Sequence, residues 1–216
     1  LNAIETGKTY SDGPSPGTYQ VRPSDHLYIH VIGDDPTSVA FLNLMPANSV
    51  GASAQSIELI TFIVDEEGNI NYPQFVQIHV AGKTIDQIRE DLQNRVDDYM
   101  QKSSVFVKLI NRTITVLGEV RAPGQHPMVK NQLSIFEALG TAGDVTDFGN
   151  RRSVKLIRET PGGKQVESID LTDPNLISSA YYYILPHDIL YVEPKSKVYG
   201  QKTMPFGTGV SLVFSA

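Results

Sequence analysis

The chain has 216 residues, of which 40% are hydrophobic, and 18 Lys and Arg stand against 24 Asp and Glu, a formal net charge of -6 at pH 7. This composition predicts a soluble, folded protein of one large or two modest domains, and it lacks the basic surplus of nucleic-acid-binding proteins, so we expect no nucleic-acid partner. The sequence contains no cysteine, which excludes thiolate metal sites, thiol nucleophiles and disulfide bonds.

Both ends of the sequence differ in composition from its middle. Residues 1–18 combine Gly and Pro with polar residues, which predicts an extended entry segment. The chain begins at Leu1 and shows no signal region, so we expect a processed or trimmed piece of a longer precursor. The last eight residues, GVSLVFSA, are too few to cross a bilayer. They are either a tail of the folded domain or the start of a membrane segment that has been cut off.

Two stretches far apart in the sequence resemble each other. YQVRPSDHLYIHV, at 19–31, and YYYILPHDILYVEP, at 181–194, both place a Pro and an Asp before an alternating apolar run. Pro fixes φ and Asp favours turns, so each stretch predicts a turn that leads into a strand. The similarity reflects either two related modules or one common device used twice.

The region 19–111 predicts a small sheet and one helix. Residues 34–56 lack a sustained period and are expected to form a loop insertion with one short helical turn around Ser38 to Leu44. A β-hairpin is predicted from the strand 57–64 and a short strand ending at Tyr72-Pro73, followed by strands near 75–80 and 104–110. Between the last two strands, Thr84 and Gln87 form a capping-box pattern before apolar residues at helical spacing, namely Ile85, Ile88, Leu92, Val96 and Tyr99.

The region 112–195 repeats this construction. Strands are predicted at 113–120 and near 126–129, with a hairpin at 153–159 and 165–171 and closing strands within 183–192. Ser134 and Glu137 form a second capping box, and Gly143 stands where a left-handed helix end belongs. The apolar stripe of this helix is Ile135, Ala138, Leu139 and Ala142. The sequence therefore predicts an α+β fold of two β-rich modules, each a small sheet with a capped helix.

Motifs for catalysis or cofactor binding are absent from the sequence. Gly82-Lys83-Thr84 resembles the end of a phosphate-binding loop, but Gln77 stands where that motif needs Gly, so Thr84 is better interpreted as a helix cap. No dinucleotide-binding, serine-hydrolase or zinc-protease motif occurs. We expect no enzyme activity, no cofactor, and no catalytic or cofactor-binding residues.

Isolated polar and aromatic clusters are weak indications of a site. Of the five histidines only His26 and His30 could share a strand face, so no metal site is predicted. The acidic clusters are expected to be solvated residues of turns and a helix end, namely Asp34-Asp35, Asp65-Glu66-Glu67 and Asp97-Asp98. Tyr181-Tyr182-Tyr183 could stack on sugar rings, but in a strand these rings would alternate between faces. The binding residues stay unassigned.

Two blocks of the sequence resemble a known family in their order. The Pro23-Ser24-Asp25 turn and VDEEGNINYPQFVQIHVAGKTIDQIREDL, at 64–92, resemble the N-terminal domain of polysaccharide export outer-membrane proteins. VLGEVRAPGQHPM, at 116–128, with the helix at Ser134, resembles their soluble-ligand-binding β-grasp domain, known as SLBB. The resemblance implies an export domain at 19–111 and a β-grasp-like domain at 112–195. These domains follow the extended segment at 1–18 and precede a C-terminal tail at 196–216, which could lead to a truncated membrane segment.

This resemblance implies a conduit rather than an enzyme. Members of the family form a ring of identical subunits on the periplasmic side of the outer membrane, through which capsule or exopolysaccharide leaves the cell. The implied partners are the polysaccharide, further copies of the chain, an inner-membrane polysaccharide co-polymerase, and the outer membrane through termini missing from this sequence. Members often carry an acylated N-terminal Cys and a C-terminal membrane segment, neither of which is present here.

A second interpretation stays open at this point. β-Grasp domains of this type also resemble parts of vitamin-binding and redox-complex proteins, so a soluble module that binds a small ligand or a glycan, without a transport role, is the alternative. The N-terminal block argues against it. An enzyme acting on polysaccharide is a third possibility, but it would need a pair of catalytic carboxylates that the sequence does not indicate.

Overall fold

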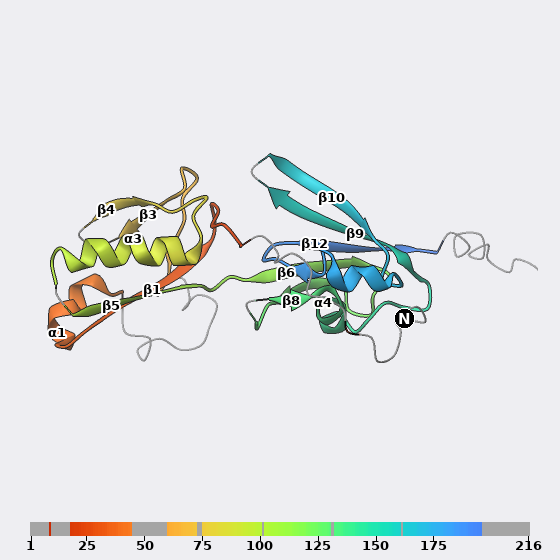
Figure 1. The fold of residues 1–216 in the computed structure, drawn as a ribbon, viewed down its shortest axis with the longest axis horizontal. Helices are drawn as coiled ribbons and strands as arrows, with labels where there is room; N and C mark the ends of the chain where they lie inside the picture. Colours follow the sequence, from red (N-terminus) through yellow and green to blue (C-terminus); the bar gives the residue numbers. More distant parts are fainter. Residues whose placement is uncertain are drawn as a thin grey trace, which may run out of the picture. The chain divides into compact units, whose positions relative to one another are not determined.

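The computed structural model describes residues 9, 18–44, 60–72, 75–100, 102–130, 132–160 and 162–195. The chain forms two compact units: the first contains Ser15–Thr113 with Pro127–Val129, and the second contains Ile114–His126 and the chain from Lys130 onward. The predicted α+β class is confirmed, since short helices and several small sheets make up these units (Figure 1). Most of the predicted entry segment, residues 45–56 of the insertion, residues 57–59 of the predicted strand 57–64 and the tail at 196–216 lie outside the described residues. The exact domain boundaries stay predictions.

A three-stranded antiparallel sheet forms the framework of the first unit. Its order is β2 (Phe62–Ile63), β1 (His26–Gly33) and β5 (Ser103–Leu109). One face of β1 and β5 is buried through alternate apolar residues, which pack in one core with the apolar stripe of α3 (Ile85–Asp97). This core includes Leu27, Ile29, Val31, Ile88, Leu92, Val96, Val105 and Leu109. The strand period of two leaves the alternate residues on the opposite face of the sheet.

The predicted hairpin between 57–64 and 69–72 is wrong in its pairing. The turn itself is present, because Asp65 accepts hydrogen bonds from the backbone N–H groups of Gly68 and Asn69 through its carbonyl and carboxylate oxygens. However, β2 pairs with the start of β1, and β3 (Asn69–Tyr72) pairs with β4 (Val76–His79). The sequence pattern identifies strands but not their partners, and β1 presents an open edge at which Phe62 lies opposite Leu27.

Helix α3 begins as the sequence predicts and ends slightly earlier. Thr84 and Gln87 bond each other's backbone N–H groups, which confirms the capping box. The helix ends at Asp97, so Tyr99 lies beyond it, and its side chain is 72% exposed rather than part of the buried stripe. Within the loop insertion, α1 (Pro36–Val39) and η1 (Ala40–Leu42) account for the short helical turn.

The second unit is built on a five-stranded mixed sheet. Its order is β10 (Gly163–Ile169), β9 (Gly149–Thr160), β12 (Ile189–Pro194), β6 (Thr113–Gly118) and β7 (Gly124–Pro127). Strands β9 and β10 form the predicted hairpin, whose tip extends away from the rest of its sheet in Figure 1. Strand β12 runs antiparallel to β9 but parallel to β6. A two-stranded sheet of β8 (Leu133–Ser134) and β11 (Tyr183–Ile184), and the short helix η3 (Pro174–Ser178), complete the unit.

Helix α4 (Ile135–Thr141) has both predicted ends. Ser134 and Glu137 form the second capping box, and the predicted apolar stripe is fully buried. At the other end, Gly143 has φ +75° and its N–H bonds the carbonyl of Gly140, while the N–H of Asp144 bonds the carbonyl of Leu139. These two bonds form a Schellman motif, in which the left-handed residue is usually Gly.

The two similar sequence stretches fold into the same turn. Ser24 and His187, each directly after the Pro, have φ values of +70° and +67°. The carboxylates of the following residues, Asp25 and Asp188, are buried and accept the backbone N–H three positions earlier, at 2.9 and 2.8 Å. Strands β1 and β12 start directly after these turns, so each stretch leads into a strand as the sequence predicts.

Candidate functional site

The histidine and acidic clusters of the sequence do not assemble into a site. His26 and His30 do share one face of β1, whereas the rings of His79 and His126 bond Asn69 and the carbonyl of Ala122. In the described ranges no group of three or more His, Asp or Glu side chains is placed to hold a metal ion. The prediction of no metal site stays a prediction.

The acidic clusters have local structural roles. Asp35 caps the start of α1 by accepting the N–H of Thr37 at 3.0 Å, and hydrogen bonds from Thr37 hold the pKa of its carboxyl below the ordinary value. Asp65 closes the turn before β3, and Asp97 accepts a hydrogen bond from Gln93 at 2.8 Å. Such carboxylates stabilise turns and helix ends rather than form a catalytic pair.

The three consecutive tyrosines do not form one strand, which corrects the expectation from sequence. Tyr183 alone lies in β11, while Tyr181 and Tyr182 belong to the turn before it. The ring of Tyr182 lies between those of Phe136 and Tyr183, at centroid distances of 6.2 and 4.9 Å. All three are only partly exposed, so they contribute to the packing around α4 and β11 more than to an open platform.

The segment that follows α4 is held by many hydrogen bonds, and sequence reasoning did not single it out. We call residues 143–149 the post-helix loop. The loop is attached to Glu119, the residue directly after β6. The N–H of Thr146 bonds the carbonyl of Glu119, and the Thr146 hydroxyl bonds the Glu119 carboxylate at 2.9 Å. A bridge between Val120 and Val145 adds to this attachment.

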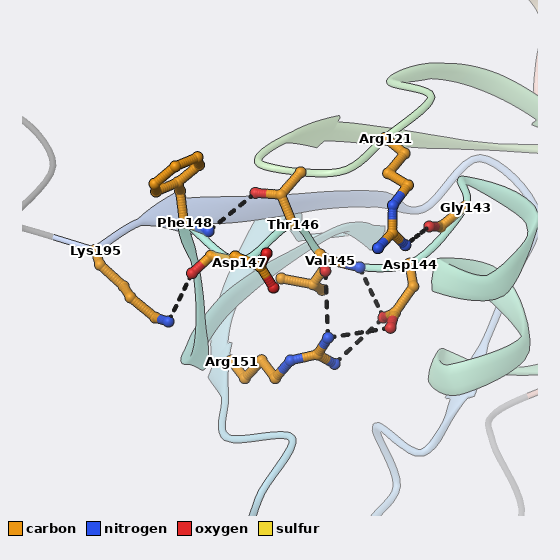
Figure 2. Close-up of polar contacts among 9 residues, drawn as sticks. All are labelled: Arg121, Gly143, Asp144, Val145, Thr146, Asp147, Phe148, Arg151 and Lys195. Atoms are coloured by element: carbon orange, nitrogen blue, oxygen red, sulfur yellow. Dashed lines mark hydrogen bonds and ion pairs between the residues drawn. The ribbon is translucent and has the colours of Figure 1, made fainter.

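Two arginines fix the start of the post-helix loop. Arg121 donates to the carbonyl of Gly143 at 2.5 Å, and Arg151 donates to both carboxylate oxygens of Asp144, at 3.2 and 3.0 Å, and to the carbonyl of Val145 (Figure 2). Asp144 also accepts the N–H of Val145 at 2.7 Å. The hydrogen bonds from Arg151 hold the pKa of the Asp144 carboxyl below its ordinary value, so the pair stays charged near neutral pH.

The far end of the loop is held by the residue that follows β12. The ammonium group of Lys195 donates to the carbonyl of Asp147, and its backbone N–H donates to the carbonyl of Phe148, both at 2.8 Å (Figure 2). The backbone of Gly149 lies so close to Val145 that an added Cβ would be 2.3 Å from Cγ1 of that residue. Hydrogen bonds therefore hold both ends of the loop, and the close approach to Val145 leaves no room for a side chain at position 149.

The result is a rigid loop with one large apolar side chain directed outward. Phe148 is 56% exposed although its N–H bonds the Thr146 hydroxyl and its carbonyl bonds Lys195. Contact residues of this kind lose little conformational freedom on binding, which favours affinity. The Thr146 hydroxyl bonds both the Glu119 carboxylate and the N–H of Phe148, so it helps to fix the backbone that carries this ring. A Phe between Asp147 and Gly149, among turn residues, is the sequence signal that could have revealed it.

Comparison with known protein families gives a match for each unit. The profile of the polysaccharide biosynthesis/export protein family matches residues 13–110, and the SLBB domain profile matches residues 112–192. The chain therefore contains a polysaccharide export domain followed by an SLBB domain. The resemblance inferred from the sequence blocks is thereby confirmed.

Two curated relatives have the same name. The EPS I polysaccharide export outer membrane protein EpsA of Ralstonia solanacearum is 30% identical over 192 residues, which cover 84% of this chain and 50% of the relative. The protein of the same name from Ralstonia nicotianae is 31% identical over 108 residues, 48% of this chain and 28% of the relative. The chain thus spans at most about half the length of these relatives. None of the helices in the described ranges is long and apolar enough to cross a membrane.

Proposed function

We propose that this chain is the periplasmic part of an outer-membrane exporter of capsule or exopolysaccharide, and that it acts as a conduit rather than as an enzyme. The observation that carries the proposal is the succession of an export domain and an SLBB domain along the chain, together with 30% identity to a polysaccharide export outer membrane protein over most of its length. The fold supports a conduit role, because two small, well-capped α+β units supply rigid building blocks.

A gene deletion in the source organism tests this proposal. The expected result is loss of polysaccharide from the culture medium and its accumulation between the two membranes, with both effects reversed by the intact gene. The measurement is sugar analysis of the medium and of the periplasmic fraction. Normal amounts of extracellular polysaccharide in the deletion strain would contradict the export role and favour the alternative of a ligand-binding module.

The exporter is proposed to be a ring of identical subunits that meets an inner-membrane polysaccharide co-polymerase. Rings use heterologous contacts, in which one face of a subunit meets a different face of the next, and an incomplete ring leaves faces unpaired. We expect the 216-residue chain to be monomeric or weakly associated in dilute solution, and the full-length protein to form a closed ring in detergent. Sedimentation of both forms checks this expectation, and a monomeric full-length protein at micromolar concentration would contradict it.

The post-helix loop is the part of the second unit that we assign to such a contact between subunits. Phe148 is exposed on a backbone that is already ordered, as expected of an anchor in a protein interface. Phe148→Ser should reduce the ring fraction of the full-length protein. Val129→Ser is the matched control, because Val129 is 84% exposed but lies outside this loop. Equal ring fractions in both variants would exclude the loop from the contact.

A further inference from the structure

The outer face of the sheet in the first unit is the strongest remaining candidate for a binding surface. Strand register places Tyr28 opposite Lys108, His30 opposite Phe106 and Ile32 opposite Ser104. All of these residues lie on the face opposite the core, because the alternate positions of β1 and β5 are buried against α3. His26 and Ile63 extend the same face onto β2. We call these eight residues the outer sheet face.

Aromatic rings occupy the middle of the outer sheet face. The rings of Tyr28 and His30 are nearly parallel, with an interplanar angle of 14° and centroids 6.0 Å apart. Phe106, beside His30 on the neighbouring strand, is 54% exposed, and Ile32 and Ile63 are 49% and 48% exposed. Tyr28 and His30 are partly exposed. Flat accessible rings stack against the C–H faces of sugar rings, whereas most exposed strand positions carry polar side chains.

The outward positions of β1 and β5 carry a cationic side chain but no anionic one. The chain as a whole is acidic, with a net charge of -6. The outward positions of β1 and β5 nevertheless carry Lys108 and two histidines and no carboxylate. Lys108 lies opposite Tyr28 in the strand register, so a cationic residue neighbours the aromatic pair on the adjacent strand. This arrangement is complementary to a polymeric ligand that combines apolar ring faces with negative charges.

The size of the face favours a narrow ligand. Strand spacing and rise make β1 and β5 together a strip roughly 20 Å long and about 10 Å wide, or roughly 200 Å². A stable protein interface buries about 800 Å² per partner and is depleted of Lys at its centre. The strip is therefore small for a second protein, but its length suits a few consecutive units of an extended glycan.

From these observations we propose that the outer sheet face binds an acidic glycan, with sugar rings stacked on Tyr28 and Phe106 and a carboxylate of the glycan paired with Lys108. The proposal rests on the proposed function in that it names the class of polymer that the exporter contacts. It makes the first unit a participant in glycan recognition and not simply a spacer.

Titration of the isotope-labelled chain, followed by amide NMR, tests the proposal. The probes are a hyaluronan hexasaccharide, which carries carboxylates, and cellohexaose, which is neutral and of equal length. We expect the hyaluronan fragment to shift amides of β1 and β5. Tyr28→Ala and Phe106→Ala should each weaken its binding by about tenfold, the loss expected for one stacking contact. Lys108→Gln should weaken hyaluronan binding several-fold and leave the weaker binding of cellohexaose unchanged.

Val166→Ala serves as the matched control, because Val166 is an equally exposed apolar strand residue, 59% exposed, in the second unit. It should leave binding of both probes unchanged. The altered side chains are exposed or partly exposed and lie outside the core, so the variants should keep the wild-type amide spectrum outside the substituted strands. The proposal is overturned if neither probe shifts β1 and β5, if Lys108→Gln affects both probes equally, or if these amides shift with protein concentration in the absence of glycan.

The export assay separates failure of this proposal from failure of the proposed function. If the Phe106→Ala, Lys108→Gln double variant binds no probe but restores export to the deletion strain, glycan binding at this face is not part of transport. If the deletion strain exports normally while the purified chain binds hyaluronan through β1 and β5, the transport role fails and the glycan site remains.

Discussion

The turns that precede β1 and β12 have the same backbone conformation, but their buried Asp carboxylates bond different side chains. In the first unit, the buried Asp25 accepts a hydrogen bond from the hydroxyl of Tyr19 at 2.8 Å. In the second, Asp188 accepts from two guanidinium nitrogens of Arg158, the shortest contact being 2.7 Å. The guanidinium also bonds the carbonyl of Tyr183, so it joins three segments of the second unit.

The two capped helices differ in a similar way. The capping box of α3 uses the neutral amide of Gln87, whereas that of α4 uses the carboxylate of Glu137, which also accepts from Lys130 at 2.7 Å. The turn and the cap of the second unit thus use charged partners where those of the first unit use neutral ones. We conclude that the backbone of a turn or cap can be retained while one or two side chains set how far it depends on charge.

The largest effect is expected from Arg158→Met. The side chains of Arg158 and Asp188 are only 13% and 2% exposed, so the variant leaves a buried carboxylate without its guanidinium contacts. Such a loss costs about 3–5 kcal/mol. Hydrogen exchange of β9 and β12 amides in the full chain should accelerate strongly, while that of β1 and β5 should not. Unchanged exchange in β12 would mean that the ion pair contributes little.

Tyr19→Phe makes the corresponding change in the first unit, with a smaller expected effect. It removes a neutral hydroxyl donor from Asp25 while the ring remains, and hydrogen bonds to charged groups contribute about 1.5–3 kcal/mol. Exchange of β1 amides should accelerate, less than that of β12 amides in the Arg158 variant. A larger effect in Tyr19→Phe than in Arg158→Met would reverse the comparison between the two turns.

Removing the two helix caps should have nearly equal effects. Thr84→Ala and Ser134→Ala each delete the oxygen that accepts the N–H at the third helical position, at a cost of about 0.5–2 kcal/mol. Thermal unfolding of the single variants provides the measurement. Unchanged melting temperatures in both variants would contradict the capping role.

The smallest expected effect is a pH dependence of stability, which the cap of α4 should show through Glu137 and the cap of α3 should lack. The hydrogen bond from Lys130, with those from Ser134, lowers the pKa of Glu137 to about 2 from its ordinary value of 4.5. Because the folded-state pKa is the lower one, this stabilisation is fully present above about pH 4.5 and is lost as the pH falls towards 2. Solvent screens the partly exposed pair, so the change should be modest. Calorimetry at pH 6 and pH 3 should show a smaller loss of stability for Glu137→Gln than for the wild type.

Much of the local structure was predictable from sequence because it depends on neighbouring residues. The two Pro-x-Asp turns, both capping boxes and the Schellman end at Gly143 are each specified within a few positions. The pairing of strands was harder to predict from the sequence. The pairing of β2 with β1 joins segments more than thirty residues apart, and no local pattern distinguishes it from a hairpin with β3.

The two candidate binding surfaces differ in what the sequence revealed. The alternation in β1 predicted that His26 and His30 share a face, but the position of Phe106 beside His30 depends on the register with β5. The post-helix loop depends on Arg121, Arg151 and Lys195, which reach it from other parts of the second unit. Convergence of side chains from separate segments is a property of the fold and not of any short stretch.

The position of β12 in its sheet has a consequence for the order of folding. Of the strands in the described part of the second unit, β12 comes last in sequence, yet it lies between β9 and β6. While the chain is being made, β6 and β9 therefore exist before the strand that joins them, and each has an edge with unpaired backbone groups. Until Ile189–Pro194 has been added, the second unit cannot complete its sheet. A nascent chain that stalls before that point exposes two unpaired strand edges, at which other chains can pair.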